Sequence, residues 1–163
     1  MLVIVGHGPS VMCSLGHLLD RHEVVRVKHG LTRDMPREHF GTRTDYICGR
    51  SNLFRPEKGG PTFWHFKDDS PWVAYYAQFK PKMWKPSHGL CAVFCAIDAL
   101  KPKEIALIGC DRMLYAEDDR SKKWNSPPTK PHPWPHDQRA ERECLFSLGI
   151  TIVDFARTHG AIS

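Results

Sequence analysis

Four short runs of apolar, mostly β-branched residues are separated by segments of helical character, and this alternation limits the possible folds more than any other feature. The runs are Leu2–Val5, Val24–Val27, Ile105–Ile108 and Ile150–Val153. Continuous apolar runs of this length are typical of strands that are buried on both faces, as in parallel sheets. Strands that alternate with helices indicate a sheet with helices packed on its faces.

We therefore predict a single Rossmann-like α/β domain over residues 1–163, with a mostly parallel twisted sheet and helices on both faces. Two further short strands are expected in "RTDYICGR" and in "PTFWHF", the second at an edge of the sheet. Helices are expected in four places: residues 11–19, residues 71–79 with Ser70 as N-cap, residues 87–101 before Pro102, and residues 136–148 before Gly149. The stretch between the last two helices holds five prolines from Pro127 to Pro135, which exclude regular structure there.

The composition is that of an ordinary globular protein, with 41% hydrophobic and 25% charged residues. No apolar stretch approaches the roughly 20 residues of a membrane span, and "MLVIVG" is too short for a signal peptide, so we expect a cytoplasmic protein. The six cysteines are then expected to be reduced and several of them buried. A net charge of +5 with ten histidines suits either a nucleotide or a nucleic acid as partner.

The first apolar run leads directly into Gly6-His7-Gly8-Pro9-Ser10. A glycine turn between a strand and a helix lets the backbone approach a phosphate, and the following helix offers its first N–H groups to the anion. Such a turn also needs small residues for purely structural reasons, so this stretch alone is compatible with both interpretations.

Three separated stretches resemble, in order, the motifs of an enzyme family. "VIVGHGPS", "LLDRHEVVRVKHG" and "FGTRTD" together resemble the long nucleotide-binding motif of the sialyltransferases of glycosyltransferase family 29. "KPSHGLCAVFCAIDALKPKEIALIGCD" resembles their short motif, and "HDQRAE" resembles their final motif, in which a glutamate follows a histidine by five residues. The bacterial sialyltransferases of family 42 are similar as well.

The resemblance implies a metal-independent inverting glycosyltransferase that moves a sugar from a nucleotide-sugar donor, expected to be CMP-linked, to a hydroxyl of a glycan or another acceptor. It implies no cofactor besides the donor substrate. The residues expected to hold the donor are Gly6, His7, Gly8, Pro9, Ser10, Lys28, Ser87, His88, Gly89, Asp111 and Tyr115. His7 and Lys28 stand where the relatives carry asparagines that contact the donor nucleotide.

His136 is the expected catalytic base, because an imidazole can accept a proton near neutral pH and the resemblance gives this histidine that role. Glu141, five residues further on, is expected to brace either the helix or the base. The resemblance also implies a role for His132, at the place of a histidine that assists the leaving phosphate in family 29. Ser87 fits both an N-cap and an anion contact, and a serine at a helix start can do both.

His88, Cys91 and Cys95 lie on one face of the expected third helix and could in principle hold zinc. Because that helix is otherwise apolar, we favour core packing for the two cysteines and expect no metal. Asp20 is expected to cap a neighbouring segment or to pair with Arg21 or Arg26.

Two further functions remain open from the sequence. A nucleic-acid-binding protein would use the basic and aromatic segment 54–85 to stack bases and neutralise phosphates. A protein of the same fold could instead bind a nucleotide without transferring a sugar, an alternative that the exchanges at His7 and Lys28 allow.

Overall fold

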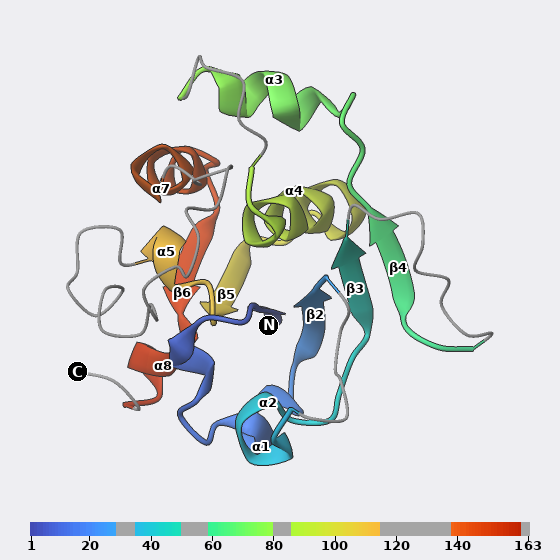
Figure 1. Cartoon of the computed structure of the whole chain (residues 1–163), viewed down its shortest axis with the longest axis vertical. Helices are drawn as coiled ribbons and strands as arrows, with labels where there is room; N and C mark the ends of the chain where they lie inside the picture. The colour runs from blue at the N-terminus through green and yellow to red at the C-terminus, as the bar shows by residue number, and fades with distance from the viewer. Residues whose placement is uncertain (29–34, 50–58, 80–85, 115–137, 161–163) are drawn as a thin grey trace, which may run out of the picture.

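The protein has a six-stranded, entirely parallel sheet with helices on both faces, and the expected fold class is confirmed (Figure 1). The computed structural model describes residues 1–28, 35–49, 59–79, 86–114 and 138–160. The strands are β1 Leu2–Val5, β2 Glu23–Val27, β3 Tyr46–Gly49, β4 Thr62–His65, β5 Glu104–Ile108 and β6 Thr151–Asp154. Their order across the sheet is β4-β3-β2-β1-β5-β6, so β4 is the edge strand that "PTFWHF" predicts.

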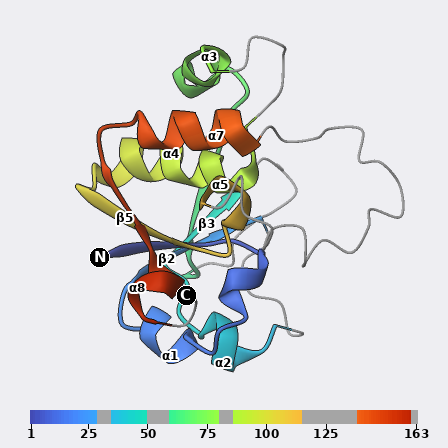
Figure 2. The ribbon, with the colours of Figure 1, turned by 90° about the vertical axis from the view of Figure 1, so that its left-hand side faces the viewer.

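The described helices form two layers around the sheet. They are η1 Pro9–Val11, α1 Gly16–Leu19, α2 Arg37–Phe40, α3 Pro71–Ala77, α4 His88–Leu100, α5 Asp111–Leu114, α7 Gln138–Phe146 and α8 Phe155–Thr158. Figure 2 shows α4 and α7 on one face of the sheet, with α3 beyond them, and α1, α2 and α8 on the other.

Alternate residues of each central strand build two separate cores. Leu2 and Ile4 of β1 pack in the core beneath α4 and α7, whereas Val3 and Val5 pack in the core above α1, α2 and α8. All four side chains are buried, as is typical of a strand covered on both faces. The continuous apolar runs in the sequence therefore have a direct physical cause in this layered arrangement.

Two of the expected helices begin where the sequence predicts. Ser70 caps α3 by accepting a hydrogen bond from the backbone N–H of Trp72, and Ser87 caps α4 by accepting one from Leu90. α4 ends at Leu100, before Pro102, because Lys101 takes a left-handed conformation as its C-cap. The cap part of the Ser87 prediction is thus confirmed.

The single helix expected over residues 11–19 is wrong. Ser14 has a φ of 57° and separates η1 from α1, and its N–H donates to His39 Nδ1 at 2.9 Å. The last strand is shifted by one residue from the expected Ile150–Val153: β6 spans Thr151–Asp154, and the side chain of Asp154 caps α8, which begins at Phe155. Helix α7 ends at Phe146, before the expected end near Gly149, and residues 136 and 137 lie outside the described residues.

Candidate functional site

The loops that follow β1 and β5 lie against each other at the carboxyl edge of the sheet. The N–H of Gly6 donates to the carbonyl of Ile108 at 2.8 Å, and the N–H of Gly8 donates to the carbonyl of Gly109 at 2.7 Å. A methyl group on Gly6 would lie 2.2 Å from the carbonyl oxygen of Gly109. The glycines of the opening motif are therefore needed for this contact between the two loops, whatever ligand they approach.

Ser10 and Asp111 fasten these loops through side-chain hydrogen bonds. Ser10 Oγ accepts from the N–H of Gly109 at 2.7 Å, and Asp111 Oδ2 accepts from the N–H of Ser10 at 3.0 Å. Both side chains are buried. A methyl group on Gly8 would lie 2.3 Å from Asp111 Oδ2, so the carboxylate lies directly under the glycine turn.

Within the described residues, only one oxygen of the Asp111 carboxylate has a hydrogen-bond partner. Oδ1 is buried and has no hydrogen bond in the part of the chain that the structure describes. Burial raises the pKa of Asp111, Asp154 raises it further, and the hydrogen bonds with Ser10 oppose both effects. A buried, half-satisfied carboxylate is costly to the fold, and a hydroxyl or amine of a ligand would satisfy it.

His7 and Lys28 meet at the carboxyl ends of β1 and β2. His7 Nε2 lies 3.2 Å from the carbonyl oxygen of Val27 and donates to it in the Nε2–H tautomer. The next residue, Lys28, has a φ of 64°, and its N–H donates to the carbonyl of Cys48 at 2.8 Å. Both side chains are exposed at this edge, where a ligand can reach two nitrogen-bearing groups.

The start of α4 packs on the same pair of loops. A methyl group on Gly89 would lie 3.4 Å from Cys110 Sγ, and one on Gly6 would lie 3.1 Å from the same sulfur atom. Cys110 thus separates the opening motif from the first turn of α4 by a single side chain. A helix of 13 residues with its N-terminus at this edge favours an anion nearby.

Glu141 fixes the start of α4 from a neighbouring helix. This residue of α7 is 1% exposed, and its Oε1 accepts a hydrogen bond from the N–H of Ser87 at 2.5 Å. The adjacent Arg142 of α7 donates to the carbonyl of Leu114 at 2.5 Å. The two contacts connect α7 to both α4 and α5, so Glu141 positions the helix that carries Ser87, His88 and Gly89.

Pro9, in η1, lies between Gly8 and Ser10 in the opening turn.

Three of the expected site residues, Tyr115, His132 and His136, lie outside the described residues, and their roles remain predictions. The metal interpretation finds no support: no group of three His, Cys, Asp or Glu side chains within the described ranges is arranged to hold a metal ion. Cys91 is buried and its thiol donates to the carbonyl of Pro86, whereas Cys95 packs against the core.

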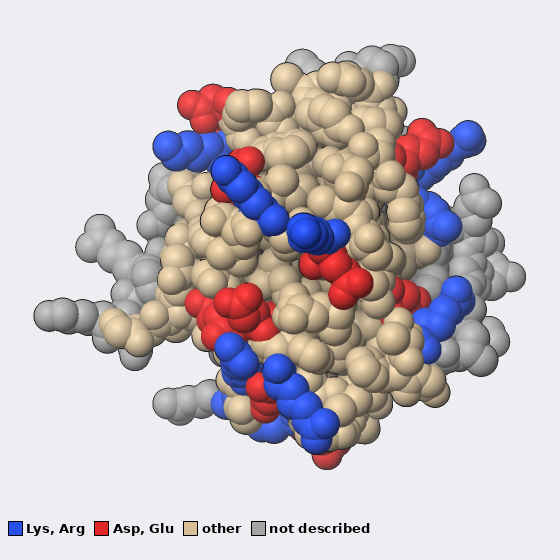
Figure 3. Space-filling model, turned by 180° about the vertical axis from the view of Figure 1, so that it is seen from behind, with Lys and Arg blue, Asp and Glu red and all other residues tan. Residues whose placement is uncertain are grey.

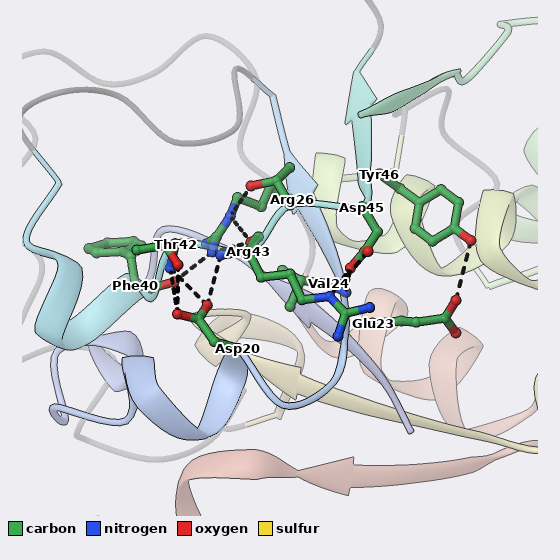
Figure 4. Close-up of polar contacts among 10 residues, drawn as sticks. Asp20, Glu23, Val24, Arg26, Phe40, Thr42, Arg43, Asp45 and Tyr46 are labelled. Atoms are coloured by element: carbon green, nitrogen blue, oxygen red, sulfur yellow. Dashed lines mark hydrogen bonds and ion pairs between the residues drawn. The ribbon is translucent and has the colours of Figure 1, made fainter. Parts of the chain in front are cut away.

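A buried arginine of β2, Arg26, organises the chain from Phe40 to Thr44, and the sequence analysis did not predict this role. Arg26 is 2% exposed although it lies in the apolar run "EVVRV". Its guanidinium donates to the carbonyls of Phe40 and Arg43 and to Thr44 Oγ1, at 2.6–3.1 Å (Figure 4). Burial lowers the pKa of Arg26 to about 10, and the nearby Asp20 carboxylate opposes this shift. The signal for this role in the sequence is a single charged residue within a run of otherwise apolar residues.

Asp20 caps the loop that follows α2. Its carboxylate accepts hydrogen bonds from the N–H and hydroxyl of Thr42 and from the N–H of Arg43, at 2.7–3.0 Å (Figure 4). Gly41, with a φ of 68°, leaves room for the carboxylate, since a methyl group there would lie 2.4 Å from Asp20 Oδ1. The capping role expected for Asp20 is confirmed, and its partners lie in "FGTRTD" rather than at Arg21.

The comparisons with known proteins address the fold. This chain is similar in structure to a mammalian sialyltransferase that was solved in complex with Gal-beta-1-3GalNAc-ortho-nitrophenol. The match covers 94% of this chain and 68% of the sialyltransferase chain, with a TM-score of 0.55. This chain has a sialyltransferase-like fold. The two sequences are 16% identical over the match, no family model matches the sequence, and none of the curated proteins is similar to it.

The alternative of nucleic-acid binding finds no support in the comparisons or in the described residues. Of the segment expected to bind nucleic acid, residues 54–58 and 80–85 lie outside the described residues. Within its described part, Trp64 stacks on Tyr46 with ring centroids 4.4 Å apart, and Trp72 stacks on Phe94 at 4.7 Å, so both tryptophans are used in packing. The face seen in Figure 3 carries acidic and basic side chains side by side rather than a basic field.

The remaining expectations concern the cysteines and the membrane. All six cysteines lie in the described residues, no disulfide joins any two of them, and four are buried. Among the described helices, none is both long enough and apolar enough to cross a bilayer.

Proposed function

We propose that the protein is an inverting, metal-independent glycosyltransferase of the sialyltransferase-like type, which transfers a sugar from a nucleotide-sugar donor to a hydroxyl acceptor. The observation that supports this most is the sialyltransferase-like fold, which extends over 94% of the chain. Residues of the opening motif, the end of β2, the start of α4 and Asp111 all lie at the carboxyl edge of the sheet, where parallel α/β folds bind ligands. The expected donor is a CMP-linked sugar.

The donor would bind across the ends of β1, β2 and β5. Lys28 and His7 would contact the phosphate, since both side chains are exposed at this edge and His7 contacts the carbonyl of Val27, the residue before Lys28. The first turn of α4, with Ser87 and Gly89, would add favourable dipoles for the same anion. The unpartnered Oδ1 of Asp111 would accept a hydrogen bond from a donor hydroxyl.

The transfer itself needs a base, an acceptor and a leaving group in line. His136 would take the proton of the acceptor hydroxyl while the acceptor oxygen forms its bond to the anomeric carbon. The bond from that carbon to the phosphate oxygen breaks on the opposite side, and its electron pair leaves with the nucleotide, which inverts the configuration. His132 and Tyr115 would stabilise the charge that grows on the departing phosphate, and Glu141 would keep the start of α4 in position.

A panel of nucleotides and nucleotide sugars tests this proposal. Binding is measured first by thermal shift and calorimetry with CMP, CTP and UDP, and transfer is then followed by release of the nucleotide with simple glycan acceptors. With the donor identified, His136→Ala should keep the affinity for the nucleotide and lower turnover by about 10²–10⁴-fold, because proton removal occurs in the transition state. The exposed His17 offers a matched control, and His17→Ala should retain parental turnover.

Each remaining outcome has a defined meaning. If His136→Ala turns over at the parental rate, His136 is not the base, and His132 is tested next. If Lys28→Ala binds the nucleotide as well as the parent does, Lys28 does not contact the phosphate. If the parent binds nucleotides but never transfers or hydrolyses a sugar, the transferase proposal is wrong and the protein is a nucleotide-binding member of the same fold.

A further inference from the structure

Strand β3 and helix α4 bring two cysteines into contact. Cys48 of β3 is completely buried, and Cys95 of α4 is partly exposed on the edge of the same core. Their side chains are hydrogen-bonded to each other. Helix α4 packs on β3, so both residues lie on rigid elements of the sheet layer rather than on loops (Figure 1).

We propose that Cys48 and Cys95 form a reversible disulfide through exchange with small disulfides such as oxidised glutathione. This modification site is separate from the proposed transferase function. It does connect to that site by position, because the carbonyl of Cys48 holds the N–H of Lys28 and α4 carries Ser87 at its start.

The chemistry of the other thiols favours this pair. Burial raises the pKa of Cys110 and of Cys144 to about 12, and burial together with Asp111 and Asp154 raises the pKa of Cys13. In contrast, the hydrogen bond with Cys48 lowers the pKa of Cys95, and this effect outweighs burial. Cys95 therefore combines partial exposure with stabilisation of its thiolate, which is the nucleophile in thiol–disulfide exchange.

The exchange proceeds in two balanced steps. The thiolate of Cys95 attacks one sulfur of oxidised glutathione, which forms a mixed disulfide and releases one glutathione thiolate. The thiolate of Cys48 then attacks the sulfur of Cys95, which closes the protein disulfide and releases the second glutathione. The two protein thiols are oxidised and one glutathione disulfide is reduced. The two released glutathione thiolates take up the two protons lost by the cysteines.

Peptide mapping across a glutathione redox series tests the proposal. The protein is equilibrated at rising ratios of oxidised to reduced glutathione, quenched with acid, unfolded so that its buried thiols react, alkylated, digested with trypsin and sequenced by mass spectrometry. We expect two of the six thiols to escape alkylation as the ratio rises, in a peptide pair that links Cys48 to Cys95, and we expect excess dithiothreitol to restore both. The tryptic peptide with Cys95 also contains Cys91, so fragmentation has to assign the linked residue.

Single variants separate this pair from a general tendency to oxidise. In Cys48→Ala, Cys95 should stop at the mixed disulfide with glutathione, and in Cys95→Ala, the buried Cys48 should stay a reduced thiol at every ratio. Cys91→Ala is the matched control on the same helix and should form the disulfide as the parent does. If Cys48→Ala does not fold, the parental map and Cys95→Ala still decide. The proposal is overturned if the folded parent shows no linkage between Cys48 and Cys95 at any ratio, or if Cys95→Ala still loses two thiols.

Discussion

Replacing Asp111 by asparagine distinguishes two roles of its buried carboxylate: stabilising the fold, or binding a ligand at a cost in stability. Asparagine retains a carbonyl oxygen that can accept the N–H of Ser10, now 3.0 Å from Oδ2, and it places a neutral amide where the unpartnered Oδ1 lies. Because the carboxylate is buried and one of its oxygens has no partner in the described part of the chain, we expect the variant to be more stable than the parent at pH 7.

The expected gain is modest and depends on pH. An unsatisfied buried polar group costs about 1–3 kcal/mol, and the amide recovers part of this, so a gain of about 1 kcal/mol and a rise in Tm of about 2–4 °C are expected. The pKa of Asp111 is raised above its ordinary value of 3.8 when the protein is folded. The folded state then holds the proton more tightly than the unfolded state, and the stability of the parent falls as the pH rises from 3.8 through the folded pKa. The advantage of Asp111→Asn should therefore vanish in acid and be complete at neutral pH.

Thermal and urea unfolding of both proteins between pH 3 and pH 8, followed by circular dichroism, measures this difference. Asp69→Asn is the control for the removal of one carboxylate, because Asp69 is exposed and its replacement should leave the stability at pH 7 close to that of the parent. A variant that is less stable than the parent at pH 7, or a difference that does not change with pH, would refute the reasoning. A variant that is more stable yet binds the donor about tenfold or more weakly would show that the carboxylate is kept for the ligand.

Three further predictions concern the loops around the sheet, and each is checked by denaturant unfolding. Gly8→Ala should cost about 1–3 kcal/mol, because its methyl group would lie 2.3 Å from Asp111 Oδ2; a cost near zero would mean that the loop shifts freely. Arg26→Met should cost about 3 kcal/mol, because it leaves three buried or partly buried acceptors without their donor, and equal stability would contradict this role. Burial alone would raise the pKa of Asp20, but hydrogen bonds from Arg43 and Thr42 outweigh burial and lower it. The ionised Asp20 therefore contributes to folding stability above pH 3.8, and this contribution is lost as the pH falls through the folded pKa. Asp20→Asn should thus reduce the loss of stability in acid, measured by denaturant unfolding.

Much of the sheet could be predicted from the sequence, because apolar runs report burial directly. β1 and β5 match their expected runs within one residue, and the edge position expected for β4 is confirmed. The break at Ser14 could not be predicted in this way. The apolar spacing of residues 11–19 fits a helix, but the chain turns at Ser14 and hydrogen-bonds to His39, a contact 25 residues away that periodicity cannot register.

The candidate site could be predicted only as a set of positions. Glycines after a strand and a serine before a helix indicate where the chain approaches a ligand, and these positions do lie at one edge of the sheet. The partners of each side chain depended on contacts across the chain. Ser87 meets Glu141 from 54 residues away, and Ser10 meets Asp111 from 101 residues away. The oxygen of Asp111 that has no partner in the described residues results from contacts between distant parts of the chain, so no local sequence pattern could predict it.

The stretch that resembles the long sialyltransferase motif has two physically different parts. Asp20 and Arg26 both hydrogen-bond to the loop 41–44, Arg26 in partly buried contacts and Asp20 in exposed and partly buried ones, and these contacts serve the fold. His7 and Lys28 are exposed at the carboxyl edge, and they are the two positions at which the sequence differs from the asparagines of the motif that it resembles. Residues that close a backbone network can be replaced only at a cost in stability, whereas exposed residues at a binding edge can change with the ligand at little cost. The hydrogen-bonded part of this stretch therefore serves the fold, whereas the exposed His7 and Lys28 belong to the edge of the sheet where we propose that a donor binds.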